Sequence, residues 1–190
     1  MNWKYIFNPF LKFDEKKIFF AGILGFIALN IACIIVGNKM DGILHFADAE
    51  KESPQNILIM SVGIMLSTIL IYLVFGKIIN RNTRFIDVAN AFLLSTIPST
   101  ILILWGAIPI FENASKRLIK LANNKSPLWS TPKDLLIVSL SAIIGLPLVV
   151  YIVILMFNGF KTATNMKKTW QIIVFFLLLF ILNSITQTYF

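Results

Sequence analysis

The stretch IFFAGILGFIALNIACIIVG, residues 18–37, contains twenty residues and no charged side chain. A helix of about 20 residues rises about 30 Å, which is the thickness of the hydrocarbon core of a bilayer. Four further charge-free stretches of similar length follow it, at residues 57–76, 88–111, 135–160 and 169–190. A surface helix of a soluble domain needs a polar face, and these segments lack one. The sequence therefore predicts an all-α fold, a polytopic membrane helix bundle with five transmembrane helices.

The composition places the whole chain in the membrane class. Hydrophobic residues make up 57% of the chain and charged residues only 14%, whereas soluble domains are about a quarter charged. The segments between the five stretches are too short to form a separate soluble core, so we expect one membrane domain over residues 1–190. The net charge of +8 is spread over the flanks of the spans. This pattern suits lipid headgroups, and we expect no nucleic-acid partner.

The distribution of basic residues predicts the orientation. Residues 1–17 alternate aromatic side chains with lysines, which is typical of a segment in the headgroup layer. Together with the second and fourth loops this segment carries ten Lys and Arg residues, against seven in the first and third loops and the C-terminal end. The positive-inside rule then predicts a cytoplasmic N-terminus and an external C-terminus. The third loop holds five cations on the opposite side, and within residues 113–123 we expect a short helix lying on the membrane surface.

The sequence contains few side chains that could carry out catalysis, proton transfer or metal binding. No ionisable residue lies within any of the five stretches, although buried charges are the usual mark of proton relays and ion pathways. The single histidine, His45, lies in the acidic first loop near Asp48, Glu50 and Glu52, where a cation site is an alternative to a solvated loop. The serines of the spans have no histidine or lysine base within the same stretch. We therefore expect no catalytic residue, cofactor or metal ion, and no enzymatic activity.

Two prolines and several uncharged polar residues lie within the spans. Pro98 and Pro147 interrupt the third and fourth stretches, and interrupted helices frame midplane binding sites in many transporters. The candidate intramembrane cluster comprises Ser95, Thr96, Pro98, Ser99, Ser139, Ser141, Pro147 and Asn183. The alternative is a kinked, close-packed bundle in which these side chains serve helix packing.

The fourth stretch carries a resemblance to a known family. The run Tyr151-Ile-Val-Ile-Leu155-Met-Phe-Asn-Gly159-Phe-Lys, a short basic turn with Met166-Lys167-Lys168 and a final apolar span resemble the Yip family. Asn8-Pro9-Phe10 and Ile97-Pro98 are similar to bacterial members. The family comprises small five-span membrane proteins named as Ypt/Rab GTPase-interacting proteins, and the resemblance implies a cytoplasmic N-terminus and an external C-terminus. The motif residues are Tyr151, Leu155 and Gly159.

The resemblance also bears on partners. Eukaryotic members are associated with vesicle traffic and small GTPases, but this chain has a 17-residue N-terminal segment and no Asp-Leu-Tyr-Gly-Pro run like theirs. We therefore do not expect a small GTPase partner. The expected role is a non-enzymatic scaffold or interaction protein of a bacterial inner membrane, in contact with lipids and with other membrane proteins or itself. The rival is a small-molecule transport or permease component that uses the proline-kinked third and fourth spans.

Overall fold

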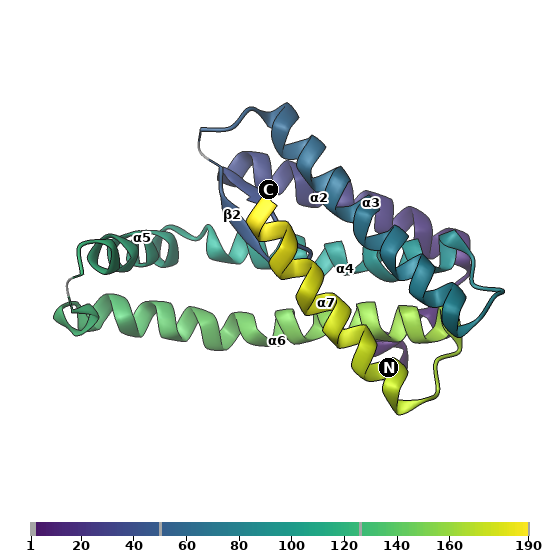
Figure 1. Cartoon of the computed structure of the whole chain (residues 1–190). Helices are drawn as coiled ribbons and strands as arrows, with labels where there is room; N and C mark the ends of the chain where they lie inside the picture. Colours follow the sequence, from purple (N-terminus) through teal and green to yellow (C-terminus); the bar gives the residue numbers. More distant parts are fainter. Residues whose placement is uncertain (1–2, 50, 126, 190) are drawn as a thin grey trace.

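The computed structural model describes residues 3–49, 51–125 and 127–189. Its described part is almost wholly helical, and five helices are long and apolar enough to cross a membrane (Figure 1). These helices are α2 (Glu15–Val36), α3 (Pro54–Ile79), α4 (Phe85–Gly106), α6 (Pro132–Thr164) and α7 (Thr169–Tyr189). The predicted all-α fold with five transmembrane helices is confirmed.

The ends of these helices follow local capping chemistry. The Ser53 side chain accepts a hydrogen bond of 3.3 Å from the N–H of Asn56, and Pro54 opens α3 because its missing N–H has no partner there. Gly37 ends α2 in the left-handed region, at φ 75°. The predicted third stretch was too long at its far end. It was expected to reach Phe111, but α4 ends at Gly106 because Pro109 begins a new helix.

Shorter elements connect the spans. The N-terminal segment forms α1 (Trp3–Phe7) and the 3-10 turn η1 (Pro9–Leu11), and a second such turn, η2, covers Leu128–Ser130. A helix is present in the third loop, as expected, and forms α5 (Pro109–Asn123). In the first loop, β1 (Asn38–Met40) pairs antiparallel with β2 (Phe46–Asp48), with Lys39 opposite Ala47.

Helix α4 is the centre of the bundle. In its most apolar stretch 67% of the residues are buried, against 22% in α6 and α7. It lies between α2 and α6 and also contacts α3. Small residues permit this close approach, since a Cβ atom on Gly22 of α2 would lie 2.7 Å from the Leu93 Cβ, and one on Gly159 of α6 would lie 2.6 Å from the Ala91 Cβ. Close packing of this kind drives helix association in lipid.

The first loop folds back into the bundle. Met40 and Ile43 are buried in the core, and the N–H of Leu44 donates a 3.0 Å hydrogen bond to Oδ1 of Asn183 in α7. Asp41 is also buried, 2.7 Å from Nδ1 of His45. The hairpin therefore covers one end of the bundle and is not the fully solvated acidic loop that its composition favoured.

Helix α5 lies along the first half of α6, and the pair extends away from the other helices (Figure 1). Nε and Nη2 of Arg117 donate to the Asp134 carboxylate at 2.8 and 2.6 Å. These hydrogen bonds raise the pKa of the Arg117 guanidinium. The 33 residues of α6 rise about 50 Å, which exceeds the hydrocarbon thickness. Part of α6 therefore lies outside the hydrocarbon core, or the helix tilts.

Substitution of Gly22 tests the close approach of α2 and α4. We expect Gly22→Ala to lower the free energy of unfolding by about 1–3 kcal/mol, because the new methyl group meets the Leu93 side chain and backbone. The measurement is unfolding by a denaturing detergent, followed by circular dichroism. Gly63→Ala is the matched control, since no heavy atom lies within 4 Å of its Cβ position and alanine favours the helix. Equal stability of the two variants would contradict the packing argument.

Candidate functional site

The N-terminal segment, residues 3–13, is docked on α6. The Tyr151 hydroxyl donates a 3.0 Å hydrogen bond to the carbonyl oxygen of Ile6. The Asn158 side-chain amide donates one of 2.8 Å to the carbonyl oxygen of Phe7. The rings of Phe7 and Tyr151 meet edge to face, with centroids 6.0 Å apart. The segment is thus held by its backbone as well as by an aromatic contact.

The three residues of the family-like motif form this dock. Tyr151, Leu155 and Gly159 are spaced by four and share one face of α6. Leu155 is buried and packs with Ile18 of α2 and Leu94 of α4. Gly159 leaves room for two neighbours at once, because a Cβ atom there would lie 2.7 Å from Cζ of Phe10 as well as against Ala91. The motif therefore joins α6 both to the central helix and to the N-terminal segment.

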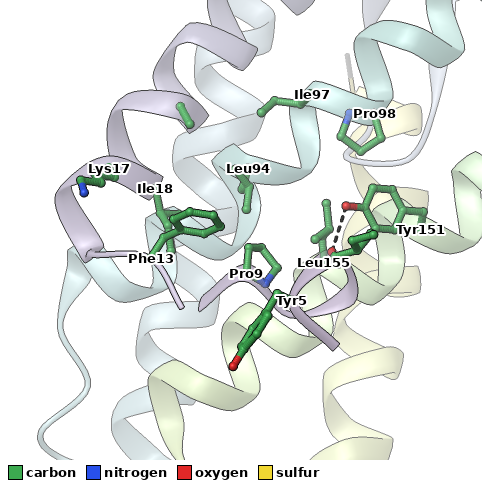
Figure 2. A pocket seen from close by; sticks show the side chains of 12 residues that line it. Tyr5, Pro9, Phe13, Lys17, Ile18, Leu94, Ile97, Pro98, Tyr151 and Leu155 are labelled. Carbon is green, nitrogen blue, oxygen red and sulfur yellow. Dashed lines mark hydrogen bonds between the residues drawn. The ribbon is translucent and has the colours of Figure 1, made fainter. Parts of the chain in front are cut away.

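A cavity of about 390 Å³, which we call the apolar groove, lies beside this dock. Helix α4 forms its floor, α2 and α6 form its walls, and the N-terminal segment closes one end (Figure 2). Lys17 and Phe13 stand on one side, and Pro98 and Tyr151 on the other (Figure 2). The complete lining is Tyr5, Ile6, Pro9, Phe13, Lys17, Ile18, Ala21, Leu94, Ile97, Pro98, Tyr151 and Leu155.

The structure divides the candidate intramembrane cluster. The four members on α4 lie together and are buried. The hydroxyls of Ser95, Thr96 and Ser99 donate to carbonyl oxygens of their own helix at 2.6, 2.6 and 2.9 Å. Such bonds satisfy the hydroxyl donor inside an apolar helix. The helix continues through Pro98, as expected for a proline flanked by hydroxyl residues.

The other members of the cluster lie elsewhere. Ser139 and Pro147 are exposed on α6. The Ser141 hydroxyl accepts a 3.2 Å hydrogen bond from Nε1 of Trp105, and Asn183 holds the first loop. The two prolines do not share a site, because Pro98 lines the apolar groove and Pro147 is not one of its lining residues.

A polar network that the sequence did not reveal joins the start of α2 to the start of α4. Arg84 donates to Asp87 at 3.0 and 2.8 Å and also pairs with Glu15. Its hydrogen bonds to Asp87, and then those to Glu15, raise the pKa of the Arg84 guanidinium. The side-chain amide of Asn90 donates to the carbonyl oxygen of Glu15 at 3.1 Å. The network aligns two helices, and its exposed ion pairs add little stability.

The two ends of the bundle differ in charge. The end formed by residues 3–17, 77–87 and 161–168, which we call the basic end, has ten Lys and Arg residues and three acids. The hairpin end has seven Lys and Arg residues and six acids. Within residues 3–49, 51–125 and 127–189, no three His, Cys, Asp or Glu side chains converge as metal ligands. The apolar groove therefore suits apolar groups, and the basic end beside it suits anionic groups.

Loss of the two anchoring hydrogen bonds should release the N-terminal segment. We expect Tyr151→Phe combined with Asn158→Ala to speed tryptic cleavage at Lys12 about tenfold, since each hydrogen bond contributes about 0.5–1.5 kcal/mol. The measurement is limited proteolysis of the detergent-solubilised protein. Tyr5→Phe is the matched control, because it removes a hydroxyl from the segment and leaves both anchors. An unchanged cleavage rate in the double variant would show that these bonds do not hold the segment.

Comparison with known protein families matches residues 6–187 to the Yip1 domain. No match was found among curated proteins or among solved structures. The matched range begins in the docked N-terminal segment and ends in α7, so it covers all five spans. It also includes the motif face of α6. The chain belongs to the Yip family.

Proposed function

We propose that this protein is a non-enzymatic scaffold or interaction protein of a bacterial inner membrane. The observation that carries the proposal is that the polar groups within the spans form hydrogen bonds inside the bundle. Ser95, Thr96 and Ser99 donate within their own helix, and Asn183 accepts from the first loop. These groups serve the packing of the bundle. What the protein presents outward is apolar surface, a basic end and the α5–α6 extension.

The first half of α6 is the surface best suited to a protein partner in the membrane. Leu136, Ile143 and Leu146 are 60%, 66% and 61% exposed on this half, although α5 covers another side of the helix. Large exposed apolar side chains next to an ordered amphipathic helix favour contact with other membrane helices or with a second copy of the chain. A role in transport has weaker support. It requires a polar site shared by the two kinked helices, whereas Pro98 faces an apolar groove and Pro147 is exposed.

The orientation follows from the charge difference between the two ends. The excess of positive charge at the basic end supports a cytoplasmic N-terminus, and five crossings then put the C-terminus outside. The bacterial source is supported by the abundance of Lys, Asn, Ile and Phe. We propose lipids and other membrane proteins as partners, without a small GTPase.

Photo-crosslinking in native membranes tests the interaction role. A photoreactive amino acid at Leu136 or Ile143 should give discrete protein adducts, since both positions are exposed on the proposed contact surface. The matched control is Val74 of α3, 63% exposed, which should give mainly lipid adducts. The same protein reconstituted in vesicles should leave solute flux at the protein-free level. A saturable flux that Pro98→Ala abolishes would instead support the transport alternative.

A pair of reporter fusions tests the orientation. A reporter active only outside the cytoplasm should be active when fused after residue 190, and the same reporter inserted at Asn82 should be inactive. The reason is that the loop at residues 80–84 belongs to the basic end. The reverse activities would place the basic end outside the cell.

A further inference from the structure

We infer that the apolar groove binds one anionic glycerophospholipid from the leaflet at the basic end. An acyl chain lies along α4 between α2 and α6, and the phosphate is held at Lys12 and Lys17. The inference goes beyond the scaffold role and does not depend on the identity of any protein partner. It rests on the shape of the groove, on the segment that closes it and on the charges at its rim.

The groove continues as an apolar track along the central helix. Ile97, Ile101 and Leu104 are 38%, 53% and 51% exposed, on a helix that is otherwise mostly buried. Their spacing of four and three residues puts them on one face of α4. The volume of about 390 Å³ is within the range of small-molecule sites. The track therefore has the length and character to hold a hydrocarbon chain.

The N-terminal segment distinguishes this site from ordinary contact with bulk lipid. Any exposed apolar face touches acyl chains in a bilayer, so apolar character alone gives no preference for one lipid. At the basic end, however, Pro9 lies between the two walls of the groove, and Phe13 stands beside Lys17 on the α2 side (Figure 2). The hydrogen bonds from Tyr151 and Asn158 to Ile6 and Phe7 hold the segment there. The part of a lipid nearest its headgroup would be enclosed on four sides.

The rim of the groove supplies the charge that selects the headgroup. Nζ of Lys12 lies 5.3 Å from the ring centroid of Tyr5 and 5.5 Å from that of Phe13, two rings that line the groove. Lys17 also lines it, and its ion pair with Asp14, at 3.6 Å between two exposed side chains, is weak. The neighbouring acid Glu15 is paired with Arg84. Two lysines are thus available to a phosphate, and each attracts anionic lipid.

Native mass spectrometry of the full chain released from nanodiscs tests the proposal. The nanodiscs contain equal amounts of phosphatidylglycerol and phosphatidylcholine. We expect the wild type to retain one phosphatidylglycerol with about tenfold preference, and Lys12→Gln with Lys17→Gln to reduce this preference to about twofold or less. Lys77→Gln with Lys168→Gln is the matched control, because both residues are exposed at the basic end and line no part of the groove. The control pair should keep the wild-type preference.

A second variant tests the position of the acyl chain. Ala21→Phe should fill the groove from its α2 wall and abolish lipid retention, whereas Leu24→Phe, 66% exposed on the same helix, should not. Photolabelling of the wild type by phosphatidylglycerol with a diazirine in its acyl chain should mark the α4 peptide that contains Ile97 and Ile101. This labelling decides the question if Ala21→Phe fails to fold.

Four results would overturn the proposal. One is retention of phosphatidylglycerol by a folded Ala21→Phe variant, and another is equal retention of the two lipids by the wild type. The third is labelling spread evenly over the exposed faces of α3 and α7, as expected for bulk lipid. A groove filled by a second copy of the chain would give a lipid-free dimer and an unlabelled α4, which also contradicts the proposal.

Discussion

The close approach of α4 to α2 and α6 is the constraint on which the rest of the structure depends. In a bilayer the surroundings are as apolar as the helix surfaces, so helices gain little by burying leucine and associate through packing and hydrogen bonds. Gly22 and Gly25 allow α2 to touch Leu93 and Thr96, and Gly159 allows α6 to touch Ala91. Helix α4 therefore becomes the buried centre, and it is also the least apolar of the five spans.

The same constraint creates the groove. Because α2 and α6 contact α4 through small residues, they leave a strip of α4 uncovered between them, marked by Ile97, Ile101 and Leu104. Gly159 serves two contacts at once, since it accepts Ala91 on the bundle side and Phe10 of the N-terminal segment. The packing of the spans and the docking of the segment therefore share a residue. A change at this position would alter the closed end of the groove as well as the helix contact.

The five helices were predictable because charge-free length against bilayer thickness is a strong signal. Their starts differ from the predicted stretches by no more than three residues, and the far end of α4 was misplaced at Pro109, which begins α5. The fold-back of the first loop was not predictable, because it depends on an amide at Asn183, 139 residues away from Leu44. No local pattern in an acidic loop predicts a contact with a helix so distant in the sequence.

The candidate cluster was harder to predict for a related reason. In a soluble helix the polar face shows which side meets solvent, but a span that is apolar all round gives no such orientation. The sequence could place Pro147 within α6 and could not tell that it is exposed, while Pro98 is buried and lines the groove. The regular spacing of four in Tyr151, Leu155 and Gly159 places these three residues on one side of the helix. Its partner, the N-terminal segment, carries the family-like run Asn8-Pro9-Phe10 but no pattern that indicates contact with α6.

The way the N-terminal segment is held explains why its sequence does not predict its contact with α6. Tyr151 and Asn158 donate to backbone carbonyl oxygens, and every residue of a chain offers a carbonyl. Apart from the ring contact of Phe7 and the packing of Phe10 against Gly159, docking of this type places few demands on the side chains of the segment. Lys12 and Phe13 are therefore free to face the groove and its rim. A segment anchored by its backbone can change the chemistry of the groove mouth without losing its place on α6.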